Sequence, residues 1–169
     1  MTALEVSSVV FTCRETWHPE RIGALAVYCS DGRWGEACDE FCHQRLLIPR
    51  YDRWAVSGGP ACLVPRDANA EFCRGTWKQL DFLARVHELE RIVLITHYGC
   101  AFYTDLLQRE ADACLPFQLE EIGSAADALR DWFSGIDVEC YLAMRKGISL
   151  SFHKLERGFD SWKEWQTSR

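Results

Sequence analysis

Two short segments of the chain carry residues whose types and spacing suit metal chemistry. The first contains Cys29, Asp31 and Arg33, and the second contains His97 and Cys100. Zinc prefers a tetrahedral set of sulfur and nitrogen ligands, and a site with two Cys and one His keeps its fourth position for water or a carboxylate. A single buried Cys or His is more often structural. The prediction of a zinc site therefore depends on the two segments meeting in space.

Each segment follows a short apolar run that is typical of a buried strand. The first run covers Ala24–Cys29 and the second covers Arg91–Thr96. Near-continuous apolar runs are typical of parallel strands that are covered on both faces. The carboxyl ends of such strands meet at one edge of an open α/β sheet, where ligands bind. The helix expected after Cys100 also favours its thiolate, because a helix N-terminus attracts negative charge.

The rest of the chain alternates between helical and strand patterns. We expect further strands at 53–57, 138–144 and 148–152, the last two joined by a turn at Lys146-Gly147. We expect helices at 36–48, 75–90, 101–111 and 124–134. The sequence therefore predicts an α/β fold with a mostly parallel central sheet, of about four parallel strands plus a C-terminal antiparallel strand, flanked by helices. The tail at 158–169 is expected to pack as a short helix.

The helix expected at 75–90 has an apolar surface wide enough to be covered on two sides. At 100° per residue, two neighbouring arcs of this helix are apolar. The first arc consists of Trp77, Leu80, Leu83 and Ala84. The second arc consists of Phe82, Val86 and Leu89. Either another helix of this chain or a subunit interface would cover the second arc. His87 lies on the apolar side and is expected to be a core histidine with a hydrogen-bond partner.

The composition is that of one globular domain and argues against several classes of protein. The chain has 169 residues, of which 48% are hydrophobic, and a formal net charge of −6. This apolar content excludes disorder, and the acidic balance argues against a nucleic acid or an anionic membrane as partner. No apolar run approaches the roughly 20 residues of a membrane span. The N-terminus lacks the pattern of a signal peptide. We therefore expect a cytoplasmic protein with a single domain at 1–169.

Nine cysteines are many for this length, and their odd number excludes complete internal pairing. Without a secretory signal, reduced thiols are expected rather than disulfides. A phosphatase-type loop needs Arg six positions after Cys29, where this chain has Gly35. An iron–sulfur cluster needs four clustered thiolates. Cys38 and Cys42, four apart on a helix, could bind a metal, but packing is favoured. We expect packing for the others as well: Cys13, Cys62, Cys73, Cys114 and Cys140.

The two segments together resemble the β-class carbonic anhydrases. That family has Cys-x-Asp-x-Arg, followed tens of residues later by His-x-x-Cys after an apolar strand. The matching residues here are Cys29, Asp31, Arg33, His97 and Cys100. The resemblance implies zinc held by Cys29, His97 and Cys100, and a dyad in which Arg33 pairs with Asp31. When the pair holds, zinc keeps its fourth position for water. In the family's resting form, the Asp binds the metal instead as a fourth ligand.

The resemblance also implies an activity, which is the reversible hydration of carbon dioxide to bicarbonate by zinc-bound hydroxide. Zinc lowers the pKa of bound water from 15.7 to about 7, so that hydroxide is available at neutral pH. A carboxylate that is oriented by an Arg can in turn orient that hydroxide. The implied partners are a small-molecule substrate and a second copy of the chain, in a homodimer or a dimer-based oligomer.

The chain departs from the family pattern near the expected substrate pocket. The family usually has Arg-Asn-Ala-Gly after its second strand, where this chain has Ser57, Gly58, Gly59 and Pro60. The glycine that usually follows the second Cys is Ala101. We do not identify the glutamine that helps to hold bicarbonate in the family. Two alternatives therefore stay open. One is a hydrolase of another small heterocumulene, such as carbon disulfide or carbonyl sulfide. The other is a zinc-binding protein without this activity.

Overall fold

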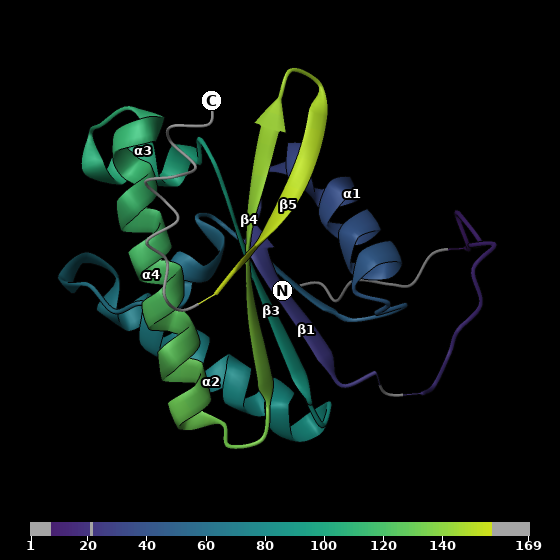
Figure 1. Cartoon of the computed structure of the whole chain (residues 1–169). Helices are drawn as coiled ribbons and strands as arrows, with labels where there is room; N and C mark the ends of the chain where they lie inside the picture. Colours follow the sequence, from purple (N-terminus) through teal and green to yellow (C-terminus); the bar gives the residue numbers. More distant parts are fainter. Residues whose placement is uncertain (1–7, 21, 157–169) are drawn as a thin grey trace, which may run out of the picture.

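Five strands form one sheet in the computed structural model, which describes residues 8–20 and 22–156 (Figure 1). In chain order they are β1 (Ala24–Cys29), β2 (Asp52–Val56), β3 (Arg91–His97), β4 (Asp137–Lys146) and β5 (Ser149–Leu155). Their order across the sheet is β2-β1-β3-β4-β5. The first four strands are parallel, and β5 returns antiparallel to β4. The predicted fold class is confirmed, including the C-terminal antiparallel strand.

The direction in which strands are added reverses at β1. The next strand in the chain, β2, pairs with one edge of β1, so that Leu25 is in register with Asp52. The following strand, β3, pairs with the other edge, so that Leu25 is also in register with Ile92. Open α/β sheets bind ligands outside the carboxyl ends of the strands at such a reversal. Here those ends are Cys29 of β1 and His97 of β3.

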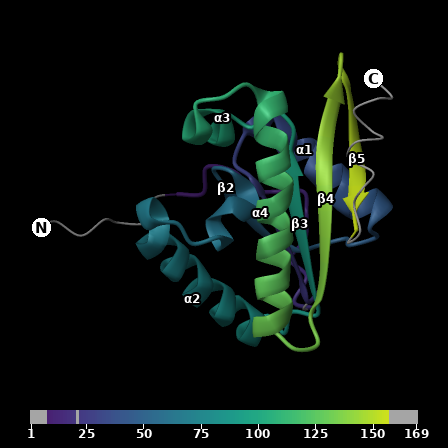
Figure 2. The ribbon, with the colours of Figure 1, turned by 60° about the vertical axis from the view of Figure 1, so that its left-hand side comes forward.

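Helices cover both faces of the sheet. They are α1 (Gly32–Glu40), α2 (Ala70–Val86), α3 (Ala101–Leu107) and α4 (Ala111–Trp132). Leu25 and Val27 of β1 pack with side chains of α2 and α4, whereas Ala26 and Tyr28 pack with side chains of α1. Figures 1 and 2 show α2 and α4 on one side of the sheet and α1 on the other. Burial on both faces explains why the central strands are continuously apolar.

Helix α1 begins earlier and ends earlier than the predicted span of 36–48. Asp31 is its N-cap residue, and the Asp31 side chain accepts a hydrogen bond from the backbone N–H of Arg33 (3.1 Å). Such a cap satisfies a donor that has no partner inside the helix, and it therefore sets the first turn. After Glu40, the chain continues in one π-helical turn, Phe41–Arg45. The prediction followed the apolar positions and so missed a first turn that is held by its cap.

Helix α2 covers Ala70–Val86 rather than 75–90. Glu88 has a φ of 53°, a left-handed conformation that ends the helix before β3. The first predicted arc is confirmed, because Trp77, Leu80, Leu83 and Ala84 all pack in the core beneath the helix. In the second arc, Phe82 is 47% exposed. That a partner subunit covers Phe82 stays a prediction.

The third and fourth helices also differ in length from the prediction. Helix α3 stops at Leu107, before the predicted end at 111, because Gln108 adopts a left-handed conformation. Helix α4 has 22 residues, Ala111–Trp132, whereas only 124–134 was predicted. Pro116 lies inside its first half, which makes that half look less helical in sequence. Since Pro116 lacks an N–H, the helix forfeits one hydrogen bond near its start.

Several predictions about single residues are corrected or lie outside the described residues. Cys13 is exposed and does not pack in the core, because the segment at 8–20 has no regular structure and all its side chains are exposed. His87 is half-buried rather than part of the core, and its Nδ1 lies 2.5 Å from Asp52. The tail at 158–169 lies outside the described residues. Among the described helices, none has the length and apolar character needed to cross a bilayer.

Candidate metal centre

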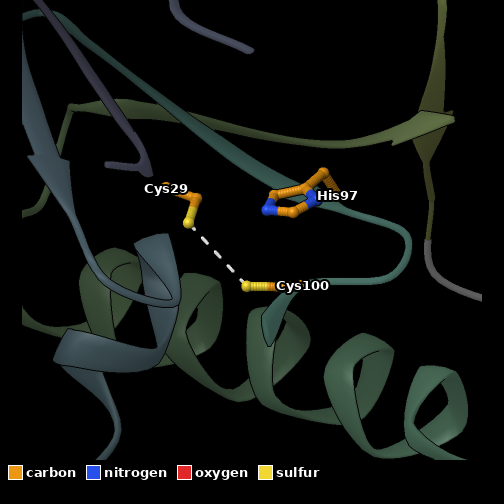
Figure 3. Close-up of side chains that lie close together, drawn as sticks. All are labelled: Cys29, His97 and Cys100. Carbon is orange, nitrogen blue, oxygen red and sulfur yellow. Dashed lines mark hydrogen bonds between the residues drawn. The ribbon is translucent and has the colours of Figure 1, made fainter. Parts of the chain in front are cut away.

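The two predicted segments meet at the carboxyl edge of the sheet. Cys29 is the last residue of β1, His97 is the last of β3, and Cys100 is the N-cap residue of α3. One ligand atom from each residue lies within 4.8 Å of the other two, and the two Sγ atoms are 3.8 Å apart. All three residues are buried. Figure 3 shows the two thiols and the imidazole ring gathered around one space. Two sulfurs and one nitrogen at these separations form a donor set that zinc prefers.

The imidazole of His97 is oriented for metal binding. Its Nδ1 lies 3.1 Å from the backbone oxygen of Tyr98. Because a carbonyl oxygen only accepts hydrogen bonds, Nδ1 carries the proton and Nε2 presents a lone pair. Within the described part of the chain, Nε2 is the one buried side-chain nitrogen or oxygen without a hydrogen-bond partner. Buried polar atoms are rarely left unpaired, so this lone pair fits a metal ion as its missing partner.

The two thiols differ in protonation. The pKa of Cys29 is lowered, mainly because the Cys100 thiol donates a hydrogen bond to it, with further help from the backbone N–H groups of Asp31 and Gly58. The pKa of Cys100 is raised, because its proton is held in that hydrogen bond and the site is buried. The hydrogen bond between the two sulfurs therefore favours one thiolate, at Cys29, beside one protonated thiol, at Cys100. A metal ion that replaces the shared proton would create the second thiolate.

Asp31 and Arg33 form the predicted ion pair beside this cluster. Arg33 Nε lies 2.9 Å from one carboxylate oxygen, and Arg33 Nη2 lies 2.5 Å from the other. The guanidinium hydrogen bonds lower the pKa of Asp31 to about 2. Asp31 is not one of the three residues whose ligand atoms cluster. In the described arrangement, Arg33 therefore holds the Asp31 carboxylate, which stays outside the cluster of candidate ligands.

Solved structures of known proteins share the architecture that positions these residues. A tetrameric β-carbonic anhydrase of the filamentous ascomycete Sordaria macrospora aligns with a TM-score of 0.51 and 13% identity, over 81% of this chain and 84% of that one. The β-carbonic anhydrase CafD of Aspergillus fumigatus aligns with a TM-score of 0.51 and 13% identity, over 86% of this chain and 95% of that one. The chain has the β-carbonic anhydrase fold. Neither the family models nor the curated proteins compared with the sequence gave a match.

The departure from the β-carbonic anhydrase pattern after the second strand has a steric reason in this chain. Gly58 has a φ of 76°, and a Cβ at this position would lie 2.5 Å from the ring of Phe102. Gly59 has a φ of 56°, and its Cβ would lie 2.9 Å from the backbone nitrogen of Cys29. Both positions therefore require glycine. The Phe102 ring occupies the space that a side chain at 58 would take.

The remaining cysteines do not form a second metal site in the described part of the chain. Cys38 and Cys42 are buried, and burial raises their pKa values to about 12 and about 11. They are neutral thiols on α1 and on the π-helical turn after it, and both pack in the core on that face of the sheet, which confirms the prediction of packing. Cys62, Cys73, Cys114 and Cys140 are also buried, as predicted.

Sequence reasoning missed two polar residues of α4 that point inward, Gln118 and Glu121, which are 1% and 6% exposed. Gln118 contacts the backbone of His97, and Glu121 pairs with Arg66. Both lie on the apolar side of the helix, next to Leu115 and Ile122. A polar residue within an apolar arc is a usable signal, but it appears only once the first half of α4 is recognised as helical.

Proposed function

We propose that this protein is a zinc-dependent carbonic anhydrase, a lyase that interconverts carbon dioxide and bicarbonate. The observation that carries the proposal is the buried cluster of Cys29, His97 and Cys100, in which the unpaired Nε2 lone pair faces two thiols. This cluster lies on the β-carbonic anhydrase fold, at the point where the order of strand addition reverses. The fold alone would not carry the proposal, because one fold hosts many functions.

In this proposal, Cys29, His97 and Cys100 hold the zinc ion. When bound, zinc lowers the pKa of a coordinated water to about 7 and thus supplies a nucleophile at neutral pH. The hydrogen bond from His97 Nδ1 to the Tyr98 carbonyl keeps the imidazole ring in its orientation and fixes the tautomer. The low pKa of Cys29 makes one of the two thiols a ready anionic ligand.

Asp31 has the second role, which is to orient the attacking group. Its carboxylate follows Cys29 by two residues, and both of its oxygens accept hydrogen bonds from Arg33. Because its pKa is about 2, Asp31 is an acceptor at every pH at which the protein would work. A carboxylate held in this way can accept a hydrogen bond from the nucleophile's O–H group and so aim the nucleophile's lone pair at the carbon of the substrate. In a resting form, the same carboxylate would turn to the metal as a fourth ligand.

We also propose a cytoplasmic homodimer with one domain per chain. All nine cysteines are free thiols, which suits a reducing compartment. Large apolar side chains are exposed at several places, among them the segment at 8–20 and α2. The side chains at these two places are Val9, Val10, Phe11, Trp17, Phe72 and Phe82. Exposed apolar side chains in such numbers are typical of a surface that meets another protein.

The experiment is a stopped-flow measurement of carbon dioxide hydration by the zinc-loaded protein between pH 6 and 9. We expect turnover that increases with pH through the neutral region, as the zinc-coordinated water ionises. Full zinc occupancy without turnover at any pH in this range would contradict the proposal. Carbonyl sulfide and carbon disulfide are tested in parallel, because turnover of these compounds alone would identify the protein as a hydrolase of small heterocumulenes.

A further inference from the structure

Helix α4 reaches the metal centre through a buried amide that lies outside both sequence motifs. Gln118 Nε2 lies 2.9 Å from Thr96 Oγ1 and 3.0 Å from the backbone oxygen of His97. Gln118, Thr96 and His97 are 1%, 2% and 3% exposed, so water does not compete for these contacts. A primary amide has two N–H donors. The carbonyl of the proposed histidine ligand is therefore held by a side chain that comes from another helix.

This contact completes the hydrogen bonding of the peptide group between residues 97 and 98. On the side of β4, the N–H of Tyr98 donates to the backbone oxygen of Ala143 (2.9 Å). On the side of β1, the pairing between β1 and β3 ends at Val27 and Leu94, which is three residues before β3 ends at His97. Gln118 therefore supplies the donor that a neighbouring strand supplies elsewhere in the sheet. With both polar groups engaged, the peptide plane cannot rotate freely.

The orientation of this peptide decides where the imidazole points. The carbonyl of the next residue, Tyr98, accepts the hydrogen bond from His97 Nδ1. A buried carbonyl that loses its donor is unfavourable, and a strand end can lower that cost by rotating. Rotation at His97 would move the Tyr98 carbonyl and release the ring. We propose that Gln118 is a positioning residue, which holds His97 in its metal-binding orientation through the His97 backbone carbonyl.

The same helix also supports the segment that carries the second thiol. Cys114 Sγ lies 3.6 Å from the backbone oxygen of Tyr103, in α3. Glu121, one turn after Gln118, pairs with Arg66, and its charge adds to burial in raising the pKa of the Tyr103 hydroxyl. Cys100 is the N-cap residue of that same α3. Helix α4 thus contacts the His97 segment through Gln118 and contacts α3, which follows Cys100, through Cys114.

The test compares Gln118→Met with Leu129→Ala. Gln118→Met removes both N–H donors of the amide, and the methionine side chain has a volume similar to that of glutamine. The control removes buried apolar volume from the same helix, in the part of the core that contains no proposed ligand. The zinc dissociation constant is measured by competition with a chelator, and the absorption spectrum of the cobalt-substituted protein reports ligand geometry. We expect Gln118→Met to weaken zinc binding by about 10–100-fold and to shift the cobalt bands. Leu129→Ala should lower the Tm and leave the zinc affinity at the wild-type level.

A second variant, Gln118→Glu, keeps the side-chain length and replaces both donors with acceptors when it is ionised. It should weaken metal binding at least as much as Gln118→Met. Wild-type zinc affinity and a wild-type cobalt spectrum would overturn the inference in folded Gln118→Met, or in folded Gln118→Glu at a pH at which its carboxylate is ionised. The inference rests on the proposed metal centre, so a wild-type protein that binds no zinc would overturn both. A wild-type protein that binds zinc but does not hydrate carbon dioxide would overturn the proposed function alone.

Discussion

At the scale of single residues, the proposed activity depends on which cation holds the carboxylate of Asp31. Arg33 contacts both carboxylate oxygens, and its backbone N–H donates to the same side chain, which caps α1. The ion pair and the helix cap therefore favour one orientation of the carboxylate. Because the pKa of Asp31 is about 2, this arrangement persists across the neutral range. A change of activity near pH 7 cannot then come from protonation of Asp31.

The variant Arg33→Ala tests this role. Without its guanidinium partner, Asp31 is free to occupy the fourth metal position, so we expect zinc content to stay at the wild-type level. Carbon dioxide turnover should fall by at least about 10-fold, since the carboxylate no longer orients the nucleophile. Stability should change little, because the Arg33 side chain is 81% exposed and exposed ion pairs contribute little. Unchanged turnover in this variant would contradict the dyad.

The unequal pKa values of the two thiols predict how many protons zinc displaces. The hydrogen bond between the two sulfurs lowers the pKa of Cys29 and raises that of Cys100, so we expect Cys29 to be a thiolate and Cys100 to keep its proton at pH 7.5. Zinc binding should therefore release about one proton from the thiols rather than two. Calorimetric titrations in buffers of different ionisation enthalpy measure this number. Release of two protons would show that Cys29 is not a thiolate before the metal arrives.

At the scale of elements, the segment between β2 and α2 shapes the site by steric fit. Residues Gly59–Leu63 form a buried 3-10 turn that packs against β1 and β3. Gly58, just before it, lies against the ring of Phe102 in α3. This contact joins the segment after β2 to the helix that begins at Cys100. Gly58, which is one of the departures from the usual pattern of β-carbonic anhydrases in this segment, is therefore matched to a side chain elsewhere in the chain.

This matching predicts non-additive effects on stability. Gly58→Ala should lower the free energy of unfolding by about 2–4 kcal/mol, from the left-handed conformation and the overlap with Phe102 together. In the double variant Gly58→Ala, Phe102→Ala, the overlap is gone. The loss should then be smaller than the sum of the two single losses, by about 1–2 kcal/mol. Denaturant unfolding of the four proteins measures this difference, and strict additivity would contradict the contact.

The strands were predictable because each central strand is apolar and ends at a marked turn. β1 was predicted at its observed bounds, and β3 to within one residue. The helices were less predictable, because their ends depend on contacts that periodicity does not encode. The cap by Asp31 sets the start of α1, and the left-handed conformation of Gln108 ends α3. Helix α4 continues through Pro116, which a pattern in the sequence alone would not predict.

The candidate ligands were predictable for a different reason, which is that strand ends lie at one edge of a parallel sheet. Cys29 and His97 meet there because β1 and β3 are neighbours. Gln118 was not predictable, since its role depends on α4 crossing behind β3. The steric need for Gly58 was equally hidden, because it arises from contact with a ring 44 positions later in the chain.

At the scale of the whole molecule, exposed apolar surface suggests that one chain is not the functional unit. Val9, Val10, Phe11 and Trp17 are between 78% and 93% exposed. Figure 1 shows this N-terminal segment looping out beside α1 rather than covering the sheet. Specific interfaces bury roughly 1,200–2,000 Å² in total, which an arm and a helix flank can provide.

We therefore expect light scattering at micromolar concentration to give at least twice the 19.5 kDa mass of the chain. Replacing both Phe11 and Trp17 with Ser should shift the protein toward the monomer, because it removes two of these exposed apolar side chains. A matched change at an exposed polar position, Lys78→Ser on α2, should leave the mass unchanged. A wild-type mass of 19.5 kDa would contradict the dimer.

The most direct test of the central claim is X-ray absorption at the zinc edge of the metal-loaded protein. If Cys29, His97 and Cys100 bind the ion, the spectrum will show two sulfurs at about 2.3 Å and one imidazole nitrogen at about 2.0–2.1 Å. One further light-atom ligand will complete the tetrahedron. The Cys100→Ser variant should lose most of its zinc, whereas Cys38→Ser should keep the wild-type spectrum. A wild-type spectrum with no sulfur ligand, or with four, would contradict this metal centre.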